Sequence, residues 1–130
     1  MIDLHCHLDG SITVEIAKKL AQLQKIELPA KTDSELLKKL SVPSDCQSLN
    51  DFLECFGLPL RLLQTKEGIT EAVRLVQEDC KAQGLEYLEI RFAPQKHCVN
   101  GLSQEEVILA ALEGLKQSSL HTNLILCLMR

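Results

Sequence analysis

Apolar and polar residues alternate strictly from position 2 to position 9 of the chain. Because the side chains of a β-strand point to opposite faces in turn, this alternation predicts a strand with one apolar and one polar face. We expect the apolar face to pack against helices, and Gly10 to let the chain turn off the strand end. The apolar positions are Ile2, Leu4, Cys6 and Leu8, and the polar positions are Asp3, His5, His7 and Asp9.

Two further segments, 85–92 and 122–129, also have the pattern of strands. In the first of these, Leu88, Ile90 and Phe92 share one face, and the opposite face carries Glu89 and Arg91. We expect this charged face to lie on the same side of the sheet as the histidines. Since buried charges are usually paired, an ion pair or a hydrogen-bond network between such groups is the simplest expectation, with a direct substrate contact as the alternative.

Between the strands, apolar residues recur with the period of amphipathic helices, at 13–25 and again at 67–83. Thr32 with Glu35, and Ser103 with Glu106, match the capping box that begins a helix. Gly84 is a typical helix stop before the second strand. A helical insertion is predicted between residues 30 and 63.

The order of strand, helices, strand, helix, strand predicts an α/β fold. Because the connections are far too long for hairpins, the strands should be parallel and covered by helices, as in β/α units. No low-complexity tract or linker divides the chain, so residues 1–130 are expected to form part of one domain.

Composition narrows the class of protein and its partners. The 130 residues are 45% hydrophobic and carry a formal net charge of -4, which gives no electrostatic footprint for nucleic acid or an anionic membrane. Six cysteines are scattered without a C-x-x-C pair, and the amino terminus does not resemble a signal peptide. We therefore expect free thiols and a cytoplasmic location.

His5 and His7 are the candidate metal ligands. Two residues apart on a strand, their Cα atoms are about 6.8 Å apart and their imidazoles can converge on one ion. Cys6 points to the opposite face and cannot be a third ligand. An H-x-H motif also occurs by chance, but polar residues on a buried strand need a compensating group such as a cation. We expect His97 to be solvated in a polar loop, and His121 to lie at the opposite end of the sheet from the metal site.

The stretch from His5 to Ser11 resembles the H-x-H-L-D-G signature of the adenosine deaminase family of zinc hydrolases. Segments 51–56, 84–94 and 126–130 are similar to family segments in the same order, so the resemblance covers essentially the whole chain. It implies an eight-stranded β/α barrel, of which this chain supplies about three strands. It also implies a zinc cofactor that activates water to attack the amine-bearing carbon of a purine nucleoside, with release of ammonia.

The resemblance also assigns roles to individual residues. His5 and His7 would be two of the zinc ligands, and His7 and Asp9 would contact the substrate, Asp9 at the nucleoside sugar. The apolar helices between residues 48 and 63 resemble a hydrophobic gate over the pocket. The family usually has Ser where this chain has Ala93, which leaves no hydroxyl for a role at that position.

The family's remaining metal ligands and its proton donor lie downstream of the matched segments. No catalytic residue is therefore expected within residues 1–130, and this segment alone should be inactive, because a catalytic zinc normally needs three protein ligands. Its unpaired strand edges should lead it to self-associate or to pair with the missing part of the barrel. The alternatives are an adenine deaminase, another amidohydrolase-type activity, or a non-catalytic half-barrel that serves as an assembly module.

Overall fold

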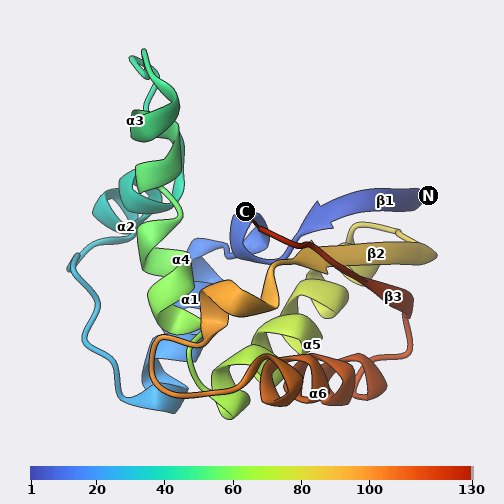
Figure 1. Ribbon diagram of the computed structural model, residues 1–130. Helices are drawn as coiled ribbons and strands as arrows, with labels where there is room; N and C mark the ends of the chain where they lie inside the picture. The colour runs from blue at the N-terminus through green and yellow to red at the C-terminus, as the bar shows by residue number, and fades with distance from the viewer. Residues whose placement is uncertain (130) are drawn as a thin grey trace.

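The computed structural model describes residues 1–129 and contains a three-stranded parallel sheet with helices packed on one face (Figure 1). The strands are β1 (Ile2–His7), β2 (Tyr87–Phe92) and β3 (His121–Leu126), in the spatial order β1-β2-β3. Both strand pairs are parallel, which confirms the predicted β/α organisation. Arg130, the last residue of the third family-like segment, lies outside the described residues.

Each pair of neighbouring strands is connected through helices. The predicted insertion between residues 30 and 63 is confirmed as three short helices, and the predicted helices around it are present. The helical elements are α1 (Val14–Gln24), α2 (Asp33–Leu40), α3 (Leu49–Glu54), α4 (Gly57–Leu62), α5 (Lys66–Ala82) and α6 (Gln104–Lys116), with 3₁₀ turns η1 (Asp9–Ser11) and η2 (Pro94–His97).

Hydroxyl side chains begin the longer helices. At α6 the capping box is complete, since the Ser103 hydroxyl accepts from the Glu106 backbone N–H and the Glu106 carboxylate accepts from the Ser103 N–H. At α2 the Thr32 hydroxyl accepts as predicted, but the Glu35 carboxylate accepts from Lys31 instead, at 3.3 Å. The sequence signal therefore located both helix starts and only one reciprocal box.

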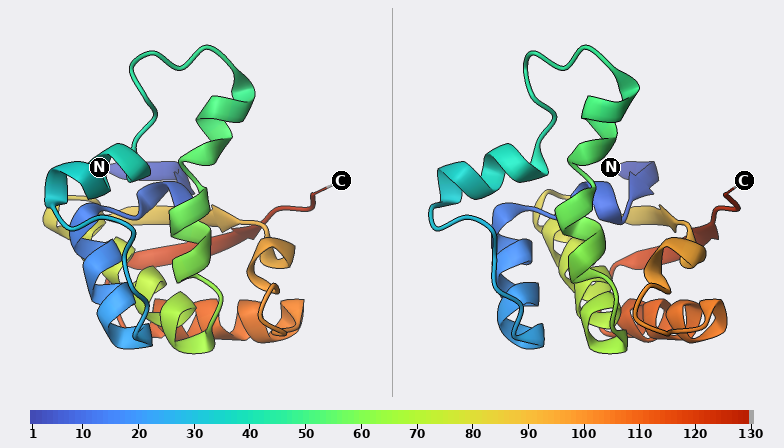
Figure 2. Two further views of the ribbon diagram at one scale, coloured as in Figure 1. Left: turned by 90° about the vertical axis from the view of Figure 1, so that its left-hand side faces the viewer. Right: turned by 60° about the vertical axis from the view of Figure 1, so that its left-hand side comes forward.

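The core lies between the sheet and helices α1, α5 and α6. The face of β2 directed at the helices carries Leu88, Ile90 and Phe92, all buried, whereas the alternate residues are only half-buried. Helices α5 and α6 approach closely at Gly114, where a Cβ atom would lie 2.5 Å from the Thr70 carbonyl oxygen. In Figures 1 and 2 the opposite face of the sheet has no helix over it, and we call it the open face.

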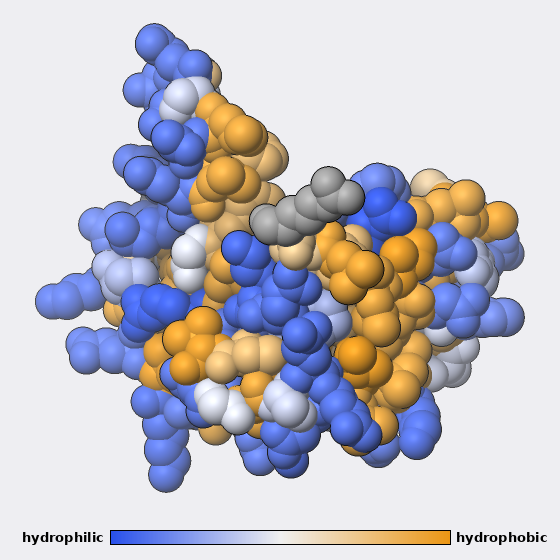
Figure 3. Space-filling model, in the orientation of Figure 1, coloured by the Kyte–Doolittle hydropathy of each residue, from blue (hydrophilic) through white to orange (hydrophobic). Residues whose placement is uncertain are grey.

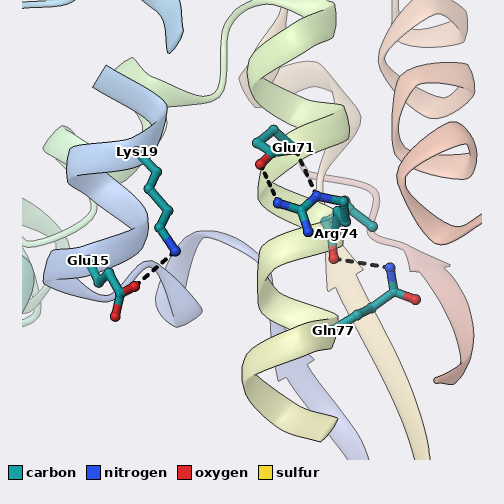
Figure 4. A network of polar contacts seen from close by, with 6 residues as sticks. Glu15, Lys19, Glu71, Arg74 and Gln77 are labelled. Atoms are coloured by element: carbon teal, nitrogen blue, oxygen red, sulfur yellow. Dashed lines mark hydrogen bonds and ion pairs between the residues drawn. The ribbon is translucent and has the colours of Figure 1, made fainter. Parts of the chain in front are cut away.

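Polar side chains on α1 and α5 pair locally within each helix (Figure 4). Arg74 donates two hydrogen bonds to Glu71 one turn away, and this contact lowers the pKa of the Glu71 carboxyl. Lys19 pairs with Glu15 on α1 at 2.8 Å. Such pairs support the helices at the surface rather than the site on the sheet.

The predicted alternation of β1 is wrong in its first half. The strand register places Asp3 beside Leu88 and Cys6 beside Ile90, with an irregularity between them. Asp3 therefore lies on the helix-covered side with Cys6, and not with the histidines. A bulge adds a residue and shifts the alternation, and the Asp3 carboxylate accepts the His5 backbone N–H at 2.9 Å within it.

The same irregularity exposes two residues that the pattern assigned to the core. Ile2 and Leu4 are 63% and 57% exposed, whereas Cys6 and Leu8 are buried as expected. Only the carboxyl-terminal half of the predicted apolar face therefore packs against the helices.

The chain from the end of α2 to the start of α4, which includes α3, projects from the body of the molecule, whereas Leu36 of α2 and Leu58 and Leu62 of α4 are buried in the core. In Figure 1 it rises on the side toward which the arrowheads of β1 and β2 point, and Figure 2 shows it standing clear of α5 and α6. Within residues 1–129, no helix is long and apolar enough to cross a membrane.

Candidate metal and substrate site

The imidazole rings of His5 and His7 face each other on the open face of β1. Their Nε2 atoms are 3.1 Å apart and their ring centroids 5.1 Å. Tetrahedral zinc holds imidazole nitrogens at about 2.0–2.1 Å, so two such ligands lie about 3.3 Å from each other. The pair therefore fits two positions around one zinc ion, and both rings are solvent-exposed.

A complete metal centre is not present in the described part of the chain. No group of three or more His, Cys, Asp or Glu side chains in residues 1–129 is placed to hold a metal ion. Cys6 points away from the histidines, as predicted, and its thiol lies 3.1 Å from the Ser11 hydroxyl. Burial raises the pKa of this thiol. Two imidazoles are therefore what residues 1–129 offer to a metal on the open face.

Asp9 lies in the turn that follows β1, and not on the strand. The strand ends at His7, and Asp9 opens the 3₁₀ turn η1, where its carboxylate accepts the Gly10 backbone N–H at 3.0 Å. A Cβ atom on Gly10 would lie 3.4 Å from the His7 Cβ and 3.7 Å from the Phe56 ring. The turn thus brings Asp9, His7 and Phe56 together at the carboxyl end of the sheet.

Glu89 and Arg91 lie on the open face, as predicted, but they enter different networks. The Glu89 carboxylate accepts from the Tyr87 hydroxyl at 2.8 Å, and that hydroxyl accepts from the Asn123 amide at 2.8 Å. Arg91 instead reaches His5, with its Nη1 at 3.0 Å from Nε2 and 3.2 Å from Nδ1. The prediction allowed an ion pair or a hydrogen-bond network, and in the described residues both side chains form hydrogen bonds and neither forms an ion pair.

His97 is buried, so the prediction of a solvated loop histidine is wrong. Its side chain is 1% exposed, its Nδ1 donates to the Leu63 carbonyl at 2.9 Å, and its ring packs edge-on against Phe92. Burial lowers the pKa of His97, against smaller opposing effects from the Leu63 hydrogen bond and the Asp9 charge. In the sequence, Pro94 is the one residue that indicates a turn here, and this turn, η2, is the element that ends at His97.

His121 opens β3 beside Tyr87, at the amino end of the sheet. It therefore lies at the opposite end from the His5 and His7 rings, as predicted from the sequence.

The helices α3 and α4 carry apolar side chains toward the sheet. Phe52 packs edge-on against Phe56 with ring centroids 5.6 Å apart, and Leu49, Phe52 and Leu53 are exposed. Figure 3 shows hydrophobic residues gathered along the side of this projecting segment that faces the sheet. An apolar wall therefore stands beside the turn that holds Asp9.

Parallel β/α units with a histidine pair at the carboxyl end of the first strand match part of a β/α barrel, a fold in which such strand ends carry the active site. The profile of the adenosine deaminase family matches residues 1–130, and the chain belongs to this family. An adenosine deaminase from Haemophilus ducreyi is 47% identical over 135 residues, which cover 100% of this chain and 39% of the relative.

Solved structures show the same fold. An adenine deaminase from Arthrobacter aurescens superimposes with a TM-score of 0.77 at 28% identity, over 96% of this chain and 38% of that one. An amidohydrolase from Burkholderia ambifaria with bound Zn has a TM-score of 0.72 at 18% identity, over 95% of this chain and 34% of that one, which shows the fold alone. The chain therefore spans less than half the length of the proteins that it matches.

Proposed function

We propose that residues 1–130 are the amino-terminal part of a single barrel domain that deaminates adenosine, or a closely related purine nucleoside, to inosine and ammonia. The observation that carries this proposal is the convergence of the His5 and His7 Nε2 atoms, 3.1 Å apart, in a chain of the adenosine deaminase family. A zinc ion held there would supply a water activated for attack at neutral pH.

His5 and His7 supply two of the zinc ligands in this proposal. His7 also lies next to the Gly10 turn, where it would border the bound substrate. The Asp9 carboxylate, at the same carboxyl end of the sheet, would accept a hydrogen bond from a sugar hydroxyl of the nucleoside. The third ligand and the groups that transfer protons come from outside residues 1–130, so this segment contributes binding and orientation but no catalytic acid or base.

Adenine, the free base, is the second candidate substrate. The adenine deaminase of Arthrobacter aurescens has the same fold at 28% identity. The 47% identity to an adenosine deaminase and the carboxylate of Asp9 favour the nucleoside. Other amidohydrolase-type reactions, or a half-barrel that only assembles with a partner, are the remaining alternatives.

We further propose a cytoplasmic protein with a small purine nucleoside as its ligand. All six cysteines are free thiols, which is typical of a reducing compartment. The net charge of -4 argues against nucleic acid and anionic membranes as partners.

Zinc content and deamination of adenosine test the proposal together. The 130-residue chain and the complete barrel protein that carries it are compared, with His5→Ala and His7→Ala in each. We expect about one zinc per complete protein, as for a single catalytic site, and activity only in that protein. Both substitutions should abolish zinc binding and activity, whereas His121→Ala, at the opposite end of the sheet, should change neither.

Asp9→Asn separates the two substrates. If Asp9 binds the sugar, this variant lowers kcat/KM for adenosine by about tenfold or more, the effect of losing a charged hydrogen bond, and leaves any turnover of adenine unchanged. A complete protein that holds no metal, with neither histidine affecting activity, would favour the assembly module instead.

A further inference from the structure

Arg91 contacts the candidate metal site from the neighbouring strand. It lies on β2 in register with His7 of β1, yet its guanidinium reaches the ring of His5. The side chain is half-buried on the open face. Arg91 is therefore placed to act on a metal ligand without itself being able to bind a metal.

The contact is made over the face of the imidazole. The Nη1 atom of Arg91 lies 3.0 Å from Nε2 and 3.2 Å from Nδ1 of His5. Within the ring plane, an atom this close to both nitrogens would clash with the Cε1 atom between them, so the Nη1 atom lies above that plane. A planar guanidinium commonly stacks on aromatic faces in this way.

His5 has few other contacts that could fix its ring. Among the described residues, its ring nitrogens approach only Arg91 and the ring of His7. Metal-binding histidines usually have their ring orientation set by a neighbouring group, most often a carboxylate or a carbonyl. In residues 1–129 no carboxylate or carbonyl plays this part for His5, and Arg91 is the one side chain other than His7 that contacts its ring nitrogens.

The other contacts of Arg91 do not explain its position. Within residues 1–129 its guanidinium forms no ion pair, and its buried Nε has no hydrogen-bond partner. Glu89, on the same face of the same strand, pairs with Tyr87 and not with Arg91. The approach of Nη1 to the His5 ring is thus the polar contact that Arg91 makes within the described residues.

We propose that Arg91 is a positioning residue of the metal site. Its guanidinium holds the His5 ring in the plane that directs Nε2 toward His7, so that the two nitrogens are already arranged for one ion. This inference rests on the proposed zinc site and adds to it a residue from the second strand.

Zinc affinity of the complete barrel protein, measured by competition with a chromogenic chelator, tests the proposal. Arg91→Met removes the planar cation at similar length, and Arg91→Lys keeps the charge without the plane. We expect both to weaken zinc binding by about 10- to 100-fold, the range found for groups that orient metal ligands. The matched control is Glu89→Gln, which changes a charge on the same face and should alter affinity less than threefold.

The outcomes separate this inference from the proposed function. If His5→Ala and His7→Ala leave zinc affinity unchanged, the zinc site itself is wrong. If they abolish binding while Arg91→Met binds normally, or if Arg91→Lys retains full affinity, the zinc site stands and positioning by stacking is overturned. Nuclear Overhauser contacts between Arg91 and the His5 ring in the wild-type protein give a test that needs no variant, and their absence also overturns the proposal.

Discussion

At the scale of single residues, His97 is the clearest source of pH dependence. Burial holds its pKa below the ordinary value of about 6.5 that it recovers on unfolding. As the pH falls below about 6.5, the unfolded chain takes up the proton first, so the free energy of unfolding falls. The loss ends once the pH drops below the folded pKa, and its slope cannot exceed about 1.4 kcal/mol per pH unit.

The variant His97→Asn isolates this effect, because its amide can still donate to the Leu63 carbonyl but does not titrate. We expect urea unfolding at pH 7.5 and 5.5 to show a smaller loss of stability in the variant than in the wild type. His121→Asn, at an exposed position, should keep the wild-type difference. Parallel pH profiles for His97→Asn and the wild type would show that His97 does not couple folding to protonation.

His97 and Asp3 also show where a single sequence stops being informative. The burial of Leu88, Ile90 and Phe92 followed from alternation, because a strand imposes a period of two on every side chain. The burial of His97 depends on the Leu63 carbonyl, which is distant in sequence, and no local pattern encodes that contact. Asp3 was misplaced because a bulge shifts the alternation without changing the residue types.

At the scale of elements, the packing of α5 on α6 depends on the absence of a side chain at Gly114. A Cβ atom there would lie 2.5 Å from the Thr70 carbonyl oxygen and 2.8 Å from the Val73 Cβ, both on α5. Alanine is the better helix former by about 1 kcal/mol, but overpacking of this kind costs about 1–3 kcal/mol. We expect Gly114→Ala to lower the free energy of unfolding, as measured by urea titration.

Gly57 provides the matched control for this substitution. It lies in α4 at a negative φ, and a Cβ atom there would meet nothing within 4 Å. Gly57→Ala should leave stability unchanged or raise it slightly. Equal effects at the two glycines would mean that helix propensity, and not the contact between α5 and α6, determines the result.

The start of α6 gives a second prediction at this scale. The Ser103 hydroxyl and the Glu106 carboxylate satisfy two backbone N–H groups reciprocally. Ser103→Ala should therefore reduce the free energy of unfolding by about 1 kcal/mol. Ser44→Ala, in an exposed loop, should have no measurable effect in the same thermal or urea titrations, and an equal loss there would argue against the cap.

Helix starts were predictable because capping is local, with donor and acceptor three residues apart. The hydrogen bond from Gln77 to the Gly114 carbonyl, which joins α5 to α6, was not predictable. At the site, the His5 and His7 pair followed from spacing on one strand. The approach of Arg91 did not, since it required the register between two strands that are more than eighty residues apart.

At the scale of the whole molecule, the sheet has two open edges. Strands β1 and β3 each pair on one side only within residues 1–129, and exposed apolar residues lie along or beside them. Exposed strand edges of this kind pair readily with other chains. We therefore expect the isolated 130-residue chain to self-associate, with a mass in sedimentation equilibrium that rises with protein concentration above the 14.5 kDa of one chain.

Charged substitutions at these edges test that expectation. Ile2, the first residue of β1, and Leu128, two residues after the end of β3, are 63% and 92% exposed. Lysine at an edge discourages pairing because its charge cannot be desolvated between strands, so Ile2→Lys combined with Leu128→Lys should shift the chain toward the monomer. The same change at Leu23 and Leu37, exposed on α1 and α2, should leave the association intact. A wild-type chain that remains monomeric at every concentration would show that the edges are protected, and association that Leu23→Lys and Leu37→Lys disrupt equally would place the contact on the helices.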